Sequence, residues 1–239
     1  MTSVARWVEV HRLAVAGREA AIARDTGNRV GRVWLATSRF TDVARLAELT
    51  LTLGADAGAF YDLGWAMNAT GDRTAALAAY DQALSLYRAA GERGSEAAPL
   101  NNIGLVYDSL GERQRALEYY AQALPITREV GNRAGEATTL NNIGSVYDSL
   151  GERQRALEYY AQALPIMREV GDRAGEAVTR YNMAMIYRAE GDLGLAVAEL
   201  QHVVELDRQV SHPDQQSGTE MLQQVRQELA DSTPNPGPR

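Results

Sequence analysis

Hydrophobic and polar positions in the middle of the chain alternate with the period of an amphipathic helix. One apolar stripe, at positions i, i+3, i+4 and i+7, consists of Leu100, Ile103, Gly104 and Tyr107. A second stripe with helical spacing consists of Ala116, Leu117, Tyr120, Ala123 and Leu124. Gly111 lies between the stripes and can adopt the left-handed conformation that ends a helix. The pattern predicts a helix, a tight turn and a second helix, which approach closely at the small residues Gly104 and Ala116.

This helical pair repeats with a period of 40 residues. Residues 101–140 and 141–180 differ at five positions, which are Leu105/Ser145, Thr127/Met167, Asn132/Asp172, Thr138/Val178 and Leu140/Arg180. The register extends outwards, with small residues at Gly64, Gly104, Gly144 and Ala184 and turn glycines at Gly71, Gly111, Gly151 and Gly191. We therefore expect four units in residues 57–210. Gly131 should end a second helix, and Asn132 and Asp172 are the expected N-caps of the helices that follow.

The motif Leu100-x2-Ile103-Gly104-x2-Tyr107, followed by Ala116-x3-Tyr120, resembles the tetratricopeptide repeat (TPR). The resemblance covers roughly two thirds of the chain. The common TPR has a period of about 34 residues and a proline near its end, whereas here the period is longer and that position holds Arg128 or Arg168. The longer unit is similar to those of kinesin light chain, Pins-type polarity adaptors and bacterial TPR arrays. The resemblance implies an all-α fold, a right-handed α-solenoid of helix-turn-helix units with helical caps.

Two prolines fall inside the second helices of this register, at Pro125 and Pro165. A proline in a helix interior removes one backbone hydrogen bond and costs roughly 3 kcal/mol. Because the helical pattern continues to Val130 and Val170, we expect a kinked helix at each proline. The alternative is a helix that ends there and restarts.

The two ends depart from the repeat. Gly31, Ala36, Phe40 and Val43 keep the spacing of Gly71, Ala76, Tyr80 and Ala83, which suggests a decayed second helix. We expect residues 1–56 to form an irregular N-terminal cap of two to four helices. Residues 211–231 should form a C-terminal capping helix that starts after a break, with Asp214 as candidate N-cap, and residues 232–239 should form a disordered tail.

Composition narrows the possible chemistry. The 239 residues carry a formal net charge of −7, contain no cysteine, and include 24 basic residues that are all arginine. Thiolate sites, Schiff-base lysines and phosphate-binding lysines are thereby excluded, and the acidity argues against nucleic-acid binding. No segment has the ~20 apolar residues of a membrane span. We expect a cytoplasmic protein without membrane contact, and the arginine- and alanine-rich composition is typical of a GC-rich bacterium.

No residue pattern in the sequence predicts catalysis or a cofactor. Ser211, His212 and Asp214 are neighbours in sequence, but they flank a proline and are better explained as a turn or cap. His11 and His202 are isolated, so surface or interhelix positions are favoured over metal ligation. The recurring Glu112 and Arg115 are explained by ion pairing on a solvated helix face. We therefore expect a protein that is not an enzyme and that has no metal or cofactor.

Binding is the better-supported function, because the resemblance implies a concave face lined by the first helix of each unit. By register, the positions on that face form columns one unit apart. They are Tyr61, Asn101, Asn141 and Tyr181; then Asp62, Asn102, Asn142 and Asn182; then Trp65, Leu105, Ser145 and Met185; and finally Asn68, Asp108, Asp148 and Arg188. An asparagine amide both donates and accepts, so an asparagine ladder can hold an extended peptide backbone. The alternative for Asn102, Asn142 and Asn182 is a bond between neighbouring first helices. Trp65 and Met185 are candidate apolar anchors, or core residues.

The charge of these columns indicates the kind of partner. Asp62, Asp108 and Asp148 disfavour a clamp for carboxylates and favour a neutral or basic extended peptide. We therefore expect a protein-interaction adaptor. The alternative is a regulatory or sensor module that binds a signalling peptide or controls an ATPase, protease or transcription factor encoded nearby. Near-identical units could also promote self-association.

Overall fold

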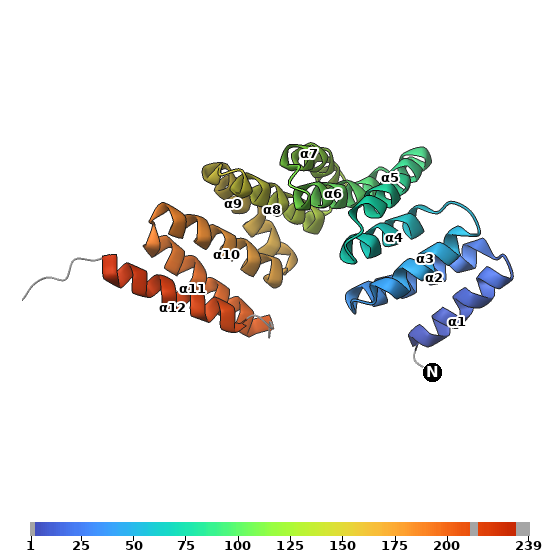
Figure 1. Ribbon diagram of the computed structural model, residues 1–239, viewed down its shortest axis with the longest axis horizontal. Helices are drawn as coiled ribbons and strands as arrows, with labels where there is room; N and C mark the ends of the chain where they lie inside the picture. The colour runs from blue at the N-terminus through green and yellow to red at the C-terminus, as the bar shows by residue number, and fades with distance from the viewer. Residues whose placement is uncertain (1–2, 211–214, 233–239) are drawn as a thin grey trace, which may run out of the picture. The chain divides into compact units, whose positions relative to one another are not determined.

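The computed structural model describes residues 3–210 and 215–232, and this part of the chain is all-α (Figure 1). The candidate N-cap Asp214, the Ser211–His212 pair and the tail after Ser232 lie outside the described residues. The described residues form α1 (Ser3–Ala16), α2 (Ala20–Ala36), α3 (Phe40–Leu51), α4 (Ala57–Ala69), α5 (Arg73–Ala90), α6 (Arg93–Ser109), α7 (Arg113–Glu129), α8 (Arg133–Ser149), α9 (Arg153–Val170), α10 (Arg173–Glu190), α11 (Leu193–Val210) and α12 (Gln215–Ser232).

The helices divide into two compact units, which comprise residues 1–126 and residues 127–239. In unit 1, each helix from α1 to α5 packs against the next helix in the chain. In unit 2, the same holds for α8 to α11. The order of first helix, turn and second helix inferred from the 40-residue period is confirmed for α6/α7, α8/α9 and α10/α11.

Left-handed glycines end the helices where the sequence predicts them. Gly111 has φ 78°, and the amide of the next residue, Glu112, donates to the Tyr107 carbonyl at 2.9 Å. Gly131 has φ 68°. The predicted N-caps after these glycines are also confirmed, because Asn132 accepts from the Gly135 amide at 3.0 Å and Asp172 accepts from the Gly175 amide at 2.9 Å.

The close approach within each unit depends on a glycine and a tyrosine. A Cβ at Gly104 would lie 2.6 Å from the Tyr120 ring, and one at Gly144 would lie 2.6 Å from the Tyr160 ring. Both rings are fully buried. The last unit carries Ala184 in place of the glycine and Leu200 in place of the tyrosine, and both are fully buried. The chain therefore changes both members of the pair together.

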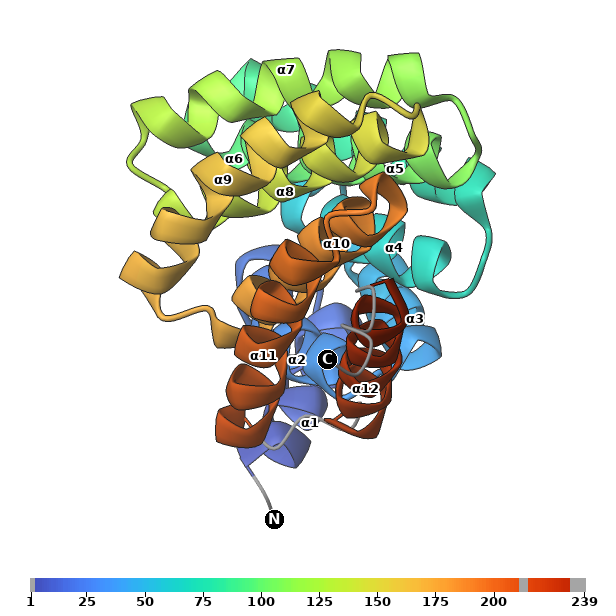
Figure 2. The ribbon, with the colours of Figure 1, turned by 90° about the vertical axis from the view of Figure 1, so that its left-hand side faces the viewer.

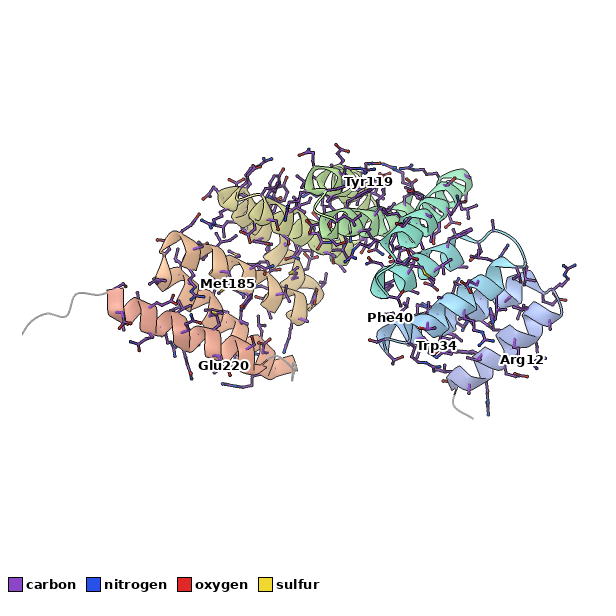
Figure 3. The ribbon with its side chains drawn as sticks, in the orientation of Figure 1. Arg12, Trp34, Phe40, Tyr119, Met185 and Glu220 are labelled. Carbon is purple, nitrogen blue, oxygen red and sulfur yellow. The ribbon has the colours of Figure 1, made fainter. Side chains whose placement is uncertain are left out.

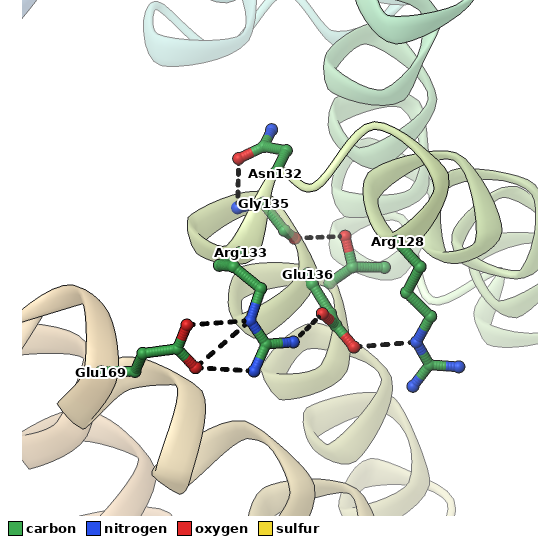
Figure 4. A network of polar contacts seen from close by, with 7 residues as sticks. Arg128, Asn132, Arg133, Gly135, Glu136 and Glu169 are labelled. Carbon is green, nitrogen blue, oxygen red and sulfur yellow. Dashed lines mark hydrogen bonds and ion pairs between the residues drawn. The ribbon is translucent and has the colours of Figure 1, made fainter.

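A cluster of charged side chains joins the second helices α5, α7 and α9 to the first helices that follow them. Glu136 is 5% exposed, and its carboxylate accepts from Arg128 at 2.8 Å and from Arg133 (Figure 4). Arg133 also donates to Glu169 at 2.8 Å. The contact recurs one period away in each direction, at Arg88–Glu96 (3.3 Å) and Arg168–Glu176 (2.8 Å). We call this the Arg–Glu clasp. In the resemblance to the common TPR, Arg128 and Arg168 occupy the place of its terminal proline.

The prolines do not end the second helices. Pro125 lies inside α7 and Pro165 lies inside α9. The alternative of an interrupted helix is therefore wrong, whereas the kink stays a prediction. Pro99 also lies inside a helix, because α6 begins at Arg93, earlier than the apolar stripe alone indicates.

The N-terminal register inferred from Gly31 and Ala36 is wrong. Both residues lie within α2, and the left-handed residue between α2 and α3 is Ser38, with φ 56°. Gly31 lies seven residues before Ser38, as Gly64 lies seven residues before Gly71, so Gly31 corresponds to the packing glycine and not to the turn glycine. The spacing from Ser38 to Gly71 is close to the common period of about 34 residues, which an alignment at 40 residues misses.

The first helices share a core with the repeats of unit 1. Val30, Trp34, Val43 and Ala66 are buried in one cluster, against which Phe40 of α3 packs (Figure 3). His11 is buried, and its Nε2 lies 2.9 Å from the Thr50 hydroxyl. Burial lowers the pKa of His11. This placement agrees with the interhelix role considered for His11 from its isolation in the sequence.

Helix α12 continues the register beyond the last helical pair, beside α11 (Figures 1 and 2). Leu222 and Val225 are buried in a cluster with Ala184 and Leu200, and Met185 packs against it. The α12 positions that correspond to the pairing face of α10 are Glu220, Gln223, Gln224 and Gln227, and all four are exposed. A polar face thus stands where a further second helix would otherwise pack.

Candidate functional site

One face of unit 1 brings together exposed apolar groups and half-buried polar groups. We call it the Trp65–Leu105 face. Trp65 of α4 and Leu105 of α6 are each 41% exposed, although both are large hydrophobic residues. They occupy the same position in consecutive units. The other members of the face are the half-buried Tyr61, Asp62, Asn101, Asn102 and Asp108.

Asn102 joins the two first helices of this face. Its amide nitrogen lies 3.1 Å from the Tyr61 hydroxyl on α4 and 3.3 Å from the Tyr80 hydroxyl on α5. The Tyr61 ring also meets the Trp65 ring edge-on, with centroids 6.5 Å apart. Burial raises the pKa of Tyr61, and the hydrogen bond from Asn102 opposes that rise. The Asn102 amide therefore makes the interhelix contact that the sequence left open as an alternative to ligand binding.

Asp62 lies against α2, and it carries less charge at neutral pH than its residue type suggests. A Cβ at Gly31 would lie 2.5 Å from its Oδ2, so the carboxyl group approaches the α2 backbone closely. Burial raises the pKa of Asp62 to about 7; repulsion from Asp56 adds to the rise and Arg32 opposes it. Burial also raises the pKa of Asp108, with Arg113 opposing. The acidity expected of these columns is thus weakened in unit 1.

The corresponding columns in unit 2 are partly occupied by contacts within the chain. Asn141 Oδ1 lies 2.8 Å from the Thr179 hydroxyl of α10. Ser145, Asn142 and Asn182 are half-buried, as is Asp148, whose pKa is raised by burial and lowered by Arg153.

The last members of these columns contact α12. Arg188 donates to Glu228 through Nε at 2.9 Å and through Nη2 at 2.5 Å. Tyr181 and Met185 pack against the cluster that includes Leu222 and Val225. Figure 3 labels Met185 on α10 and Glu220 on α12. The sequence did not reveal the pairing of Arg188, because the two partners are one full period apart and the second lies in the cap.

A cavity of about 280 Å³ opens beside Tyr181 in unit 2. Its lining combines side chains of three helices, α10, α11 and α12, which lie side by side in Figure 2. They include Val178, which is 52% exposed, and Asp207, which is 6% exposed. Sequence reasoning missed this cavity. The available signal was the Thr138/Val178 difference between two nearly identical copies.

The surface chemistry otherwise matches a solvated helical array. Glu112 and Arg115 form an exposed ion pair at 2.7 Å, and the Arg115 guanidinium lies over the Tyr107 ring at 4.0 Å, as expected for surface pairing. No group of three or more His, Asp or Glu side chains within residues 3–210 and 215–232 could hold a metal ion. Over the same ranges, no helix combines the length and apolar composition that crossing a bilayer requires.

These features define an α-solenoid built from helix-turn-helix repeats. The chain belongs to the tetratricopeptide repeat family: the sequence pattern of the repeat matches residues 56–129, 95–169 and 135–209, which together make up more than half of the chain. Repeats of this family generally mediate protein–protein interactions.

Solved structures share the fold at low sequence identity. BtubC (BKLC) from P. vanneervenii is 18% identical with a TM-score of 0.65, over 100% of this chain and 97% of that chain. The apo form of RapI is 15% identical with a TM-score of 0.67, over 95% and 72%. A putative kinesin light chain from Podosopora anserina, with nearly identical TPR-like repeats, is 16% identical with a TM-score of 0.60, over 79% and 96%. No curated protein is similar enough in sequence to count as a match.

Proposed function

We propose that this protein is a non-catalytic adaptor, and that its Trp65–Leu105 face binds an extended segment of a protein partner. The observation that carries the proposal is the pair of large apolar side chains, each 41% exposed, at equivalent positions of two consecutive units. Exposed apolar groups with polar neighbours are typical of interaction sites. The exposed Trp65 is also of the residue type that most often dominates binding energy.

The polar members of the face support binding of a backbone. Asn101 and Asn102 each carry an amide with two donors and one acceptor, although both also make contacts within the chain, Asn102 with Tyr61 and Tyr80. Because a peptide backbone presents one donor and one acceptor at almost every residue, such groups can bind a segment without depending on its side chains. Apolar side chains of the segment would then pack on Trp65 and Leu105.

The partner we propose is neutral or basic. The protein as a whole carries a net charge of −7 and the chain has no lysine, although burial raises the pKa of Asp62 and Asp108 on the face itself. An acidic segment would meet like charge, which disfavours association. The same net charge supports a protein partner over nucleic acid, and we propose a cytoplasmic location in a bacterium.

Affinity capture from a lysate of the source organism tests the proposal. The wild-type chain is compared with a Trp65→Ala/Leu105→Ser variant, in which the second change installs the residue found at Ser145 in the next unit. The control is Leu110→Ser, because Leu110 is 46% exposed but follows the C-terminal end of α6, outside the face. All three proteins should have the same helical circular dichroism.

We expect a partner that the wild type and the control capture and the double variant loses. A partner that all three proteins capture equally would overturn the assignment of the face. Loss in the control as well as in the double variant would place binding over the turn and would equally contradict the proposal.

A further inference from the structure

We infer that the cavity between α10, α11 and α12 is a subsite for a basic side chain, lysine or arginine, of a bound segment. The inference rests on the proposed function, because it concerns a second contact for the same kind of partner. It concerns unit 2 alone and uses none of the residues of the Trp65–Leu105 face. The two proposals can therefore fail separately.

The cavity has the size of a side-chain pocket. Its volume of about 280 Å³ lies just below the range of about 300–1,000 Å³ that small-molecule sites occupy. Its walls are apolar, formed by Ala177, Val178 and Tyr181 of α10 and by Val203 of α11. The aliphatic stem of a lysine or arginine can pack on such walls while its charged end reaches a polar group.

The polar group is the carboxylate of Asp207. It is 6% exposed, and it lines the cavity together with Gly218 of α12. A carboxylate accepts about four hydrogen bonds, so an ammonium or guanidinium can be added to the contacts that Asp207 makes within the chain. A cation in an apolar cavity needs such a partner, because an unpaired buried charge is costly.

Two residues at the same register position, Val178 and Gly218, shape the cavity. Val178 replaces the Thr138 of the preceding unit, and it provides an apolar wall with 52% of its surface exposed. Gly218 takes the equivalent position in α12, one period later. A Cβ there would lie 3.2 Å from Asp207 Oδ2 and 3.5 Å from Val203, so any larger residue would crowd the carboxylate.

The test uses synthetic peptides and the full chain. Alanine pentapeptides with blocked ends carry lysine, norleucine or glutamate as the central residue, and binding is followed by the backbone amide NMR shifts of the ¹⁵N-labelled protein. Norleucine has the stem of lysine without its charge, so the lysine-to-norleucine ratio reports on the contribution of the charge, which the Asp207→Asn variant then assigns to Asp207. We expect saturable shifts at Val178, Tyr181, Val203 and Gly218, about tenfold tighter binding of the lysine peptide than of the norleucine peptide, and none of the glutamate peptide.

Variants locate the effect. Asp207→Asn should bring the lysine and norleucine peptides to equal affinity, and Val178→Thr should weaken lysine-peptide binding by roughly three- to fivefold. The matched control is Thr138→Val, which makes the same exchange in reverse one unit earlier and should change nothing. If Asp207→Asn does not fold, Val178→Thr and the peptide series still decide the matter.

Three results would overturn the inference: no shifts at the cavity with the lysine peptide, equal affinity of the wild type for lysine and norleucine, or an equal effect of Thr138→Val. A captured partner that still depends on Trp65 and Leu105 would then leave the proposed function standing. Conversely, a pocket that selects lysine in a protein whose captured partner ignores the Trp65–Leu105 face would remove only the first proposal.

Discussion

Single residues set the distance between paired helices in this protein. The chain pairs Gly104 with Tyr120 and Gly144 with Tyr160, but it pairs Ala184 with Leu200. A tyrosine ring leaves no room for a Cβ on the facing helix, whereas a leucine does. The small residue and the residue that faces it therefore change together, from glycine with tyrosine to alanine with leucine. Introducing the alanine–leucine pair into another unit tests this relation.

Gly104→Ala should lower the free energy of unfolding by about 1–3 kcal/mol, because the new Cβ would overlap the buried Tyr120 ring. Adding Tyr120→Leu, which copies the Ala184–Leu200 pair, should recover part of the loss. Gly194→Ala is the control, since nothing lies within 4 Å of its Cβ position in α11, and it should stabilise the protein by up to about 1 kcal/mol. Urea denaturation measures all three, and an unchanged midpoint for Gly104→Ala would contradict the packing argument.

Asp62 should make stability depend on pH. Its pKa of about 7 in the folded protein is higher than the ordinary value of 3.8, so the folded state holds its proton more tightly than the unfolded state does. The contribution of Asp62 therefore favours folding below about pH 4, decreases as the pH rises from 4 to 7, and is constant above that. At pH 8, Asp62→Asn should be more stable than the wild type by roughly 2–4 kcal/mol.

Urea denaturation of both proteins at pH 4.5 and pH 8 checks this prediction. The difference in the free energy of unfolding between variant and wild type should grow as the pH rises. A difference that is the same at both values would show that Asp62 titrates normally in the folded state.

For single residues, the sequence predicted local roles such as capping, but it did not predict contacts between residues that are distant in sequence. Asn132 and Asp172 were identifiable as caps because a cap is a local feature, set by the residues next to it in sequence. The pKa of Asp62 was not predictable, because it depends on the approach of the α2 backbone at Gly31. Arg188 was assigned to the binding face, but its partner Glu228 comes from the last helix.

The Arg–Glu clasp is the main polar connection between consecutive helical pairs, and it explains how the longer unit dispenses with the proline of the common repeat. The arginine stands eight residues before the glutamate, across the turn, in three successive copies. The glutamate is buried each time. A buried carboxylate that accepts from arginines on both sides of the turn ties the start of the next first helix to the end of the preceding helix.

Glu136→Gln should lower the free energy of unfolding by about 1–3 kcal/mol, because the buried acceptor of Arg128 and Arg133 loses its charge. Glu169→Gln is the matched control: it contacts the same Arg133, but its side chain is 56% exposed, so the cost should stay below about 1 kcal/mol. Chemical denaturation at low and high salt compares the two. Equal losses of unfolding free energy in the two variants would show that burial does not determine the contribution of Glu136 to stability.

The helix interior prolines should cost stability. Pro165 is exposed, so its replacement removes little packing and restores one backbone donor to α9. Pro165→Ala should raise the free energy of unfolding by about 1–2 kcal/mol, and Pro125→Ala in α7 should do the same. A loss of stability in both variants, measured by thermal denaturation, would indicate that the prolines are needed to shape the helices.

Helices were predictable wherever the 40-residue period held. The period fails at the N-terminal end, where Ser38 supplies the left-handed turn that glycine supplies elsewhere. A serine with positive φ leaves no trace in the sequence pattern, and Gly31 then aligned with the wrong glycine. Helices were therefore predicted correctly for the N-terminal segment, but their register was wrong because Ser38 takes the place of the turn glycine.

At the scale of the molecule, the near-identical middle units have diverged where binding is proposed. Of the five differences between residues 101–140 and 141–180, Leu105/Ser145 lies on the Trp65–Leu105 face and Thr138/Val178 lies at the cavity of unit 2. The other three differences lie elsewhere: Thr127/Met167 and Leu140/Arg180 are buried in both copies, and Asn132/Asp172 exchanges one N-cap for another. The differences at Leu105/Ser145 and Thr138/Val178 are the ones expected if each unit contacts different residues of a partner.

The fold was predictable from the sequence because a repeat states the same pattern several times. The site was predictable only as columns of positions. Their meaning depends on which side chains the chain itself covers: Met185 and Tyr181 pack against the cluster completed by α12, whereas Trp65 and Leu105 stay exposed. No pattern within a single unit could distinguish these two outcomes.

Site-specific photo-crosslinking tests directly whether a partner binds at the Trp65–Leu105 face. A benzoylphenylalanine is placed at Leu105, on the Trp65–Leu105 face, or at Leu110, which is similarly exposed but lies at the turn. Each protein is irradiated with the captured partner and analysed by mass spectrometry. We expect a crosslink from position 105 to a short extended segment of the partner and none from position 110. A crosslink from position 110 alone would place the partner on another surface and would contradict binding at the Trp65–Leu105 face.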